Sequence, residues 1–169
     1  MDVAEHIASR LKHERTQRGW SLDDLAGRSQ VSRAMISKIE RRASTPTAVL
    51  LARLADALGV TLSSLMFEQR TPDAGVTRLG EQAQWQDPAS GYTRRMVSAA
   101  VHEGDAEIVA VELPAGARVR FAAGSTLQID GQVLLLQGSL QVSFVAQTLT
   151  PTQAQAQVQM QPQIGRAHV

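Results

Sequence analysis

Cationic and hydrogen-bonding side chains recur at helical spacing in VSRAMISKIERR, residues 31–42. At about 100° per residue, Met35, Ile36 and Ile39 fall on one side of a helix. The opposite side carries small, polar and positive residues: Arg33, Ala34, Ser37, Lys38 and Arg41. Guanidinium and ammonium groups in this pattern suit phosphate oxygens and the acceptor atoms of guanine. A solvated helix surface would show the same charges, so the pattern alone leaves both interpretations open.

Helix signals around this stretch predict a bundle of five short helices in residues 1–68. The first helix has Val3, Ile7 and Leu11 four residues apart and ends near Gly19. The expected N-caps are Ser21, Ser32 and Thr45, and a last short helix is expected from Thr61. Ser21 has Asp24 at the spacing of a capping box. The fourth helix is expected to begin at Pro46 and to end at Gly59.

The apolar period changes after a linker at residues 69–79, which contains Pro72 and Gly75. Alternating residues then predict strands at 92–101, 106–113, 117–121, 132–136 and 140–145. The expected fold class is therefore α + β with two domains. A five-helix bundle at 1–68 precedes a partial β-barrel at 80–149.

Residues 150–169 differ from the rest of the chain because glutamine alternates with small or apolar residues between 153 and 163. Small side chains bury too little area to fix a strand register, so a low-complexity, disordered or artefactual tail is expected. The last six residues, IGRAHV, back-translate to codons that match a widely used sequencing adapter. We therefore expect 164–169 to be adapter read-through in a truncated gene record.

Composition and charge narrow the class of protein. Of the 169 residues, 43% are hydrophobic and 20% charged, and none is cysteine. No apolar run approaches the ~20 residues of a membrane helix, and the N-terminus lacks the pattern of a signal peptide. A soluble cytoplasmic protein is expected, with no membrane partner. Residues 1–70 carry a net charge of +3 and residues 71–169 a net charge of −2, so the cations gather in the helical part.

Two helices joined by a short turn, the second with a cationic face, form the helix-turn-helix unit at 21–41. Residues 6–67 resemble the XRE (lambda-Cro-like) helix-turn-helix domain of bacterial transcription regulators. The resemblance rests on the helix lengths, on the buried positions Ala26, Val31 and Ile36, and on the segments IER and ALGV. It implies that the second helix of the unit, 32–41, enters the major groove of double-stranded DNA.

The resemblance also implies a role for each position. Arg33 and Ala34 open the recognition helix, Ser37 and Lys38 lie one turn deeper, and Arg41 and Ser21 suit phosphates. The expected DNA-binding set is thus Ser21, Ser32, Arg33, Ala34, Ser37, Lys38 and Arg41. Arg15 and Glu40 are implied to form a structural ion pair between the first and third helices.

Two positions depart from the pattern of the family, which has glycine where this chain has Gln30 and Arg42. If the backbone there stays left-handed, each side chain costs about 1–2 kcal/mol. These two residues are expected to affect the stability of the helical domain more than its function. Arg42 is also a candidate for a further phosphate contact.

The second part, VELPAGARVRF…DGQVLLLQGSLQVSF, resembles the front half of a cupin barrel. Metal-binding cupins have histidines and a glutamate where this chain has residues 125–128 and Gln132, so no metal and no cofactor are expected. His102 is predicted to be a surface histidine or one whose hydrogen bonds are satisfied within the fold. Arg118 and Arg120 share a strand face; they either hold an anionic effector or, as we favour, face solvent. Trp85, Tyr92 and Phe121 are expected in the core.

The sequence thus predicts a DNA-binding transcriptional regulator, more commonly a repressor in this family, that acts as a homodimer on a two-fold operator. The tail would sense a small-molecule effector. No catalytic residue is expected. Two alternatives stay open: an antitoxin-like regulator whose tail binds a partner protein, and a cupin enzyme with a helical head.

Overall fold

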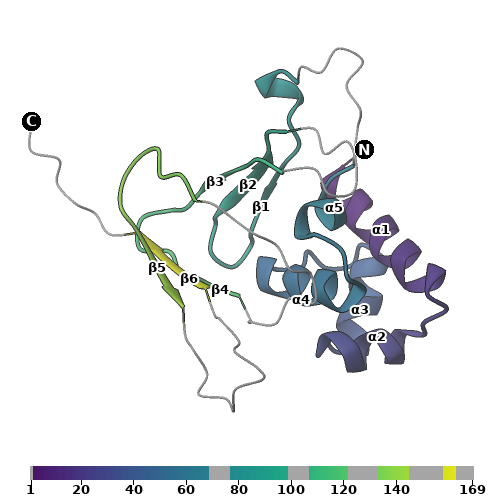
Figure 1. Ribbon diagram of the computed structural model, residues 1–169. Helices are drawn as coiled ribbons and strands as arrows, with labels where there is room; N and C mark the ends of the chain where they lie inside the picture. The colour runs from purple at the N-terminus through teal and green to yellow at the C-terminus, as the bar shows by residue number, and fades with distance from the viewer. Residues whose placement is uncertain (1, 69–76, 99–106, 122–132, 145–157, 163–169) are drawn as a thin grey trace, which may run out of the picture.

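The computed structural model describes residues 2–68, 77–98, 107–121, 133–144 and 158–162. Figure 1 shows a helical head and, beside it, a tail of short strands. The helices of the head are α1 (Val3–Gln17), α2 (Leu22–Ser29), α3 (Arg33–Glu40), α4 (Ala48–Leu58) and α5 (Leu62–Met66). The predicted five-helix bundle is therefore confirmed.

The core of the head is formed by apolar side chains from all five helices. The fully buried ones include Ile7, Leu11, Leu25, Ile36, Ile39, Leu51, Leu54 and Leu65. Each buried leucine or isoleucine contributes about 2 kcal/mol relative to an exposed one. Ile36 and Ile39 hold α3 against α1 and α2, which leaves the opposite side of α3 outside the core.

Side-chain caps begin the helices, as predicted for α2 and α3. Ser21 and Asp24 form the capping box, with Asp24 N donating to Ser21 Oγ (3.1 Å) and Ser21 N donating to Asp24 Oδ2 (2.8 Å). The Ser21 hydroxyl also donates to Asp24 Oδ2 (2.6 Å), and this bond, together with the one from Ser21 N, lowers the pKa of Asp24. Ser32 caps α3 and Thr61 caps α5 by accepting from the backbone of Met35 (3.2 Å) and Ser64 (3.0 Å).

The start of α4 differs from the prediction. Its N-cap is Thr47, whose Oγ1 accepts from Leu50 N (3.3 Å), rather than Thr45, and Pro46 precedes the helix. The physical reason lies in the tail, because Asp87 Oδ1 accepts a hydrogen bond from Ala48 N (2.9 Å). A carboxylate is thus fixed at the first residue of α4, where it satisfies a donor that the helix itself leaves unpaired. Gly59 ends α4 with a left-handed φ of 67°, as predicted.

Gln30 and Arg42 are the non-glycine residues with positive φ in the described residues, at 55° and 58°. The backbone at both positions is therefore left-handed, which is the conformation that favours the glycines of the family pattern. Gln30 gains some compensation, because its Nε2 donates to Gly27 O (2.7 Å). Arg42 lies 3.4 Å from Glu5, and both side chains are largely exposed, so this ion pair stabilises the head little.

We expect Arg42→Gly to raise the free energy of unfolding by about 1 kcal/mol, because it removes left-handed strain and loses only an exposed ion pair. Arg41→Gly is the matched control: Arg41 has a φ of −92°, so glycine there should destabilise the head. Urea denaturation of both variants measures the difference. Stabilisation by both, or by neither, would contradict the role assigned to the backbone of Arg42.

The tail contains two antiparallel three-stranded sheets, preceded by a short 3₁₀ turn, η1 (Leu79–Glu81). The first sheet has the order β1-β2-β3, with β1 (Gln84–Gln86), β2 (Thr93–Met96) and β3 (Val109–Glu112). The second has the order β4-β6-β5, with β4 (Val119–Arg120), β5 (Leu140–Phe144) and β6 (Val158–Pro162). The α + β layout in two parts is confirmed, whereas closure into a cupin-like barrel stays a prediction.

One strand prediction, and the disorder expected for residues 158–162, differ from the structure. Residues 133–136 were expected in a strand but have no regular structure, and their apolar side chains are exposed. Residues 158–162, within the tail expected to be disordered, form β6 instead. Because β6 is the central strand, β4 and β5 pair with both of its edges. Backbone pairing on two sides sets a register that small side chains alone would not fix.

The first sheet docks on the head rather than standing apart from it. Arg94 donates to Ser63 Oγ (2.8 Å), and Thr61 Oγ1 donates to Glu107 Oε1 (2.9 Å). Trp85 and Tyr92 are buried with their rings edge to face, 6.0 Å apart, in the apolar cluster that also contains the core of the head. Their predicted place in the core is confirmed, and Phe121 is half-buried against the same cluster.

None of the described helices has the length and apolar character needed to cross a lipid bilayer.

Candidate nucleic-acid interface

The turn between α2 and α3 positions the recognition helix. Gln30 leaves α2 with a left-handed backbone, Val31 is buried, and Ser32 caps α3. Val31 anchors the turn in the core, and the cap fixes the first residue of the next helix. Together with the buried isoleucines of α3, these contacts determine which face of the helix meets solvent.

The outer face of α3 presents most of the predicted DNA-binding residues. Arg33, Ala34 and Lys38 are exposed, and Ser37 is half-buried. Arg41 follows the helix, is exposed, and donates from Nε to Ser37 O (3.2 Å). The predicted DNA-binding side chains of α3 thus lie together on the side of the helix that faces away from the core.

Ser21 and Ser32 are exposed, but each hydroxyl oxygen serves a helix start. Arg33 Nε lies 3.6 Å from Asp23 Oδ1, which brings the first turn of α2, and hence Ser21, close to the start of α3. Both side chains of the pair are more than 60% exposed, so the ion pair is weak and Arg33 can exchange it for another acceptor. Nothing in the sequence indicated the contact between Asp23 and Arg33.

A second ion pair, between Arg15 of α1 and Glu40 of α3, connects these two helices. Arg15 donates from Nε to Glu40 Oε1 (2.7 Å) and from Nη2 to Glu40 Oε2 (2.8 Å), while its Nη1 donates to Trp20 O (2.8 Å). The Arg15 and Glu40 side chains are 11% and 9% exposed. The hydrogen bonds that Arg15 donates to the Glu40 carboxylate raise the pKa of Arg15. The ion pair implied by the family resemblance is present, and it fixes the C-terminal end of α3 against α1.

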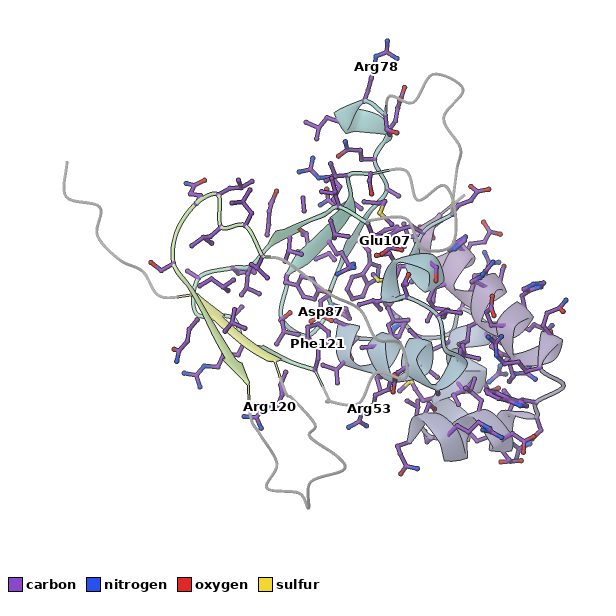
Figure 2. All side chains as sticks on the ribbon, in the orientation of Figure 1. Arg53, Arg78, Asp87, Glu107, Arg120 and Phe121 are labelled. Atoms are coloured by element: carbon purple, nitrogen blue, oxygen red, sulfur yellow. The ribbon has the colours of Figure 1, made fainter. Side chains whose placement is uncertain are left out.

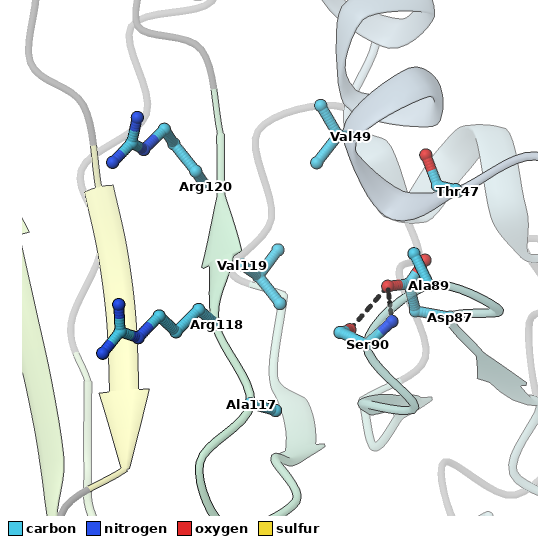
Figure 3. A pocket seen from close by; sticks show the side chains of 9 residues that line it. All are labelled: Thr47, Val49, Asp87, Ala89, Ser90, Ala117, Arg118, Val119 and Arg120. Atoms are coloured by element: carbon cyan, nitrogen blue, oxygen red, sulfur yellow. Dashed lines mark hydrogen bonds between the residues drawn. The ribbon is translucent and has the colours of Figure 1, made fainter.

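The described part of the tail contains no group of three His, Asp or Glu residues close enough to hold a metal ion. The positions compared with cupin ligands, 125–128 and Gln132, lie outside the described residues, as does His102. Arg118 and Arg120 are both exposed on β4, an edge strand. Figure 3 shows both side chains pointing away from the cavity beside α4. The solvent-facing interpretation of these arginines is thus supported.

Asp87 is a structurally important residue that the sequence did not reveal. It lies in DPASGY, a typical turn sequence, and the turn was foreseeable from proline and glycine. Its partner, Ala48 N, is 39 residues away in the chain, so no local signal could link them. Figure 3 shows Asp87 beside Thr47, with hydrogen bonds to Ser90.

Comparison with known proteins supports the helix-turn-helix assignment. Residues 11–65 match the family HTH_3, described as Helix-turn-helix. The HTH-type transcriptional regulator SutR of Escherichia coli (strain K12) is 37% identical over 82 residues, which is 48% of this chain and 46% of SutR. The chain thus spans about half the length of the curated relative it matches.

A solved structure extends the similarity into the tail. The crystal structure of an HTH_3 family transcriptional regulator from Vibrio cholerae is similar over 75% of this chain and 68% of that chain. Its sequence identity is 26% and its TM-score 0.55. Since the head ends at residue 68, this coverage includes residues of the tail as well as the helices.

Proposed function

We propose that this chain is a sequence-specific DNA-binding transcriptional regulator of the XRE helix-turn-helix type, and that α3 binds in the major groove of its operator. One observation carries the proposal: α3 buries Ile36 and Ile39 while Arg33, Ala34 and Lys38 stay exposed on its outer face. The match of residues 11–65 to HTH_3 and the likeness to SutR support it.

Within this proposal, Arg33 and Lys38 donate to base edges, for which guanine O6 and N7 are the best acceptors. Ala34 and Ser37 lie between these two cations in the sequence, and their small side chains allow the helix to approach the bases closely. Arg41, Ser21 and Ser32 contact phosphates, which orient the protein on the duplex but carry no sequence information.

The test begins with selection of bound fragments from genomic DNA by the purified chain, followed by titration of the selected duplex and its single-base variants. Arg33→Ala and Lys38→Ala are each expected to cost about 1–3 kcal/mol and to relax preference at one base pair. Arg41→Ala should weaken binding to all sequences alike. It should also reduce the slope of log affinity against log salt by about one.

Arg78→Ala is the matched control, because Arg78 is exposed just before η1 and Figure 2 shows it at the opposite side of the molecule from Arg53. This variant removes one positive charge without touching the head. Equal losses on every sequence for Arg33→Ala and Lys38→Ala would contradict their assignment as base contacts. Failure of the unaltered chain to bind any duplex at low ionic strength would contradict the function itself.

Three finer parts belong to the same proposal: the chain acts in the cytoplasm as a homodimer on a two-fold operator, it represses, and its tail responds to a small molecule. A cavity of about 300 Å³ between α4 and β4 supports the last part. Its size reaches the lower end of the range for small-molecule sites. Light scattering of the purified chain tests the dimer, and a reporter gene behind the selected operator tests the sign of regulation.

A further inference from the structure

We propose that Arg118 and Arg120 on β4 bind the phosphate backbone of duplex DNA beside the segment contacted by α3. The tail then supplies a second, sequence-independent part of the DNA interface. This inference rests on the proposed function, and its test is designed to fail separately from that function.

The first observation is the division of β4 between two faces. Val119 is 4% exposed and joins the apolar cluster, whereas Arg118 and Arg120 on either side of it are exposed. In Figure 3, Val119 points toward Val49 of α4, and the two guanidinium groups leave the strand in the opposite direction. One side of β4 therefore packs on the head through Val119, and the other side carries both arginines.

The second observation is where β4 touches the head. Thr47 and Val49, at the start of α4, line the same cavity as Ala117 and Val119. Thr47 follows Arg41 by six residues, so β4 lies next to the connection that leaves the C-terminal end of α3. A duplex that passes in front of α3 continues past this end of the helix. The connection and β4 are the next elements on that side.

The third observation is the charge of these segments. Residues 41–55 include Arg41, Arg42 and Arg53 and no acidic residue, and residues 113–121 include Arg118 and Arg120 and no acidic residue. Figure 2 shows Arg53 and Arg120 at the same edge of the molecule and Arg78 at the opposite edge. A cluster of guanidinium groups complements the regularly spaced phosphates of DNA.

An anionic effector inside the tail fits the geometry less well. The cavity beside β4 is lined by the Asp87 carboxylate, by the apolar Val49 and Val119, and also by Arg118 and Arg120, whose guanidinium groups point away from it in Figure 3. A negatively charged ligand in that cavity would meet a carboxylate instead of a guanidinium group. The outward direction of Arg118 and Arg120 favours a ligand that approaches from outside the molecule.

The test compares two duplexes, the minimal selected operator and the same operator extended by about one helical turn, roughly 10 base pairs, on each side. The full chain should bind the extended duplex more tightly. Arg118→Ala and Arg120→Ala should each lower that affinity about three- to tenfold and reduce the slope of log affinity against log salt by about one. Binding to the minimal duplex and the order of preference among sequences should not change.

Arg78→Ala removes the same charge and should leave both affinities unchanged. Arg118→Lys and Arg120→Lys keep the charge and should retain most of the salt dependence, which separates a phosphate contact from a local change in the strand. If the alanine variants behave like Arg78→Ala on the extended duplex, the inference is wrong while the proposed function stands. If the unaltered chain binds neither duplex, both are wrong.

Discussion

Replacing Arg15 by alanine is expected to lower the free energy of unfolding by about 3 kcal/mol, the lower end of the range for breaking a buried ion pair. The variant leaves the Glu40 carboxylate, whose side chain is only 9% exposed, without its two guanidinium donors. It also removes the hydrogen bond to Trp20 O, which holds the connection between α1 and α2 against α1. Urea denaturation of the full chain, followed by far-ultraviolet circular dichroism, measures the loss.

Arg53→Ala is the control for this prediction, because Arg53 is an exposed arginine on α4 and its removal should change stability little. A double-mutant cycle with Glu40→Ala isolates the pair itself: Arg15→Ala should cost much less once Glu40 is gone. A loss below about 1 kcal/mol, similar to that of Arg53→Ala, would show that the pair is no stronger than an exposed one.

The same variant has a functional consequence under the proposed role of α3. Glu40 is the last residue of α3, and Arg15 ties it to α1. Loosening this end of the helix should weaken operator binding without changing which bases are preferred. Base preference measured on the single-base variants therefore distinguishes Arg15 from Arg33 and Lys38.

Replacing Asp87 by alanine is expected to lower the free energy of unfolding by about 2–3 kcal/mol. Asp87 is 3% exposed and accepts hydrogen bonds from Ala48 N (2.9 Å) and from Ser90 N (2.8 Å). Without the carboxylate, the first amide of α4 is buried with no acceptor. The turn between β1 and β2 also loses the hydrogen bond that Ser90 N donates to Asp87. The loss should also weaken the docking of the tail, because Asp87 joins the two parts directly.

Hydrogen exchange at Ala48 N is the most specific measurement for this prediction, since Asp87→Ala should speed exchange there more than at the amides of α1. Asp87→Asn keeps one acceptor oxygen and should have a smaller effect. Glu112→Ala, at an exposed carboxylate on β3, is the control and should leave the exchange of Ala48 unchanged. Unaltered exchange at Ala48 in Asp87→Ala would contradict the capping role.

The sequence by itself determined most of the head. Apolar spacing, the serine and threonine caps and Gly59 act within a few residues, so the five helices and the outward face of α3 could be predicted locally. The family resemblance supplied what local patterns do not contain, namely the Arg15–Glu40 pair across 25 residues and the left-handed positions Gln30 and Arg42.

Only the tertiary structure decided the start of α4, the pairing of β6 and the docking of the tail. Each depends on partners far apart in the chain: Ala48 with Asp87, β6 with β4 and β5, and Ser63 with Arg94. The apolar run 133–136 shows the converse, because its strand-like composition found no neighbouring strand in the described residues. A helix satisfies its own backbone within one turn, whereas a strand exists only when a distant segment supplies its hydrogen bonds.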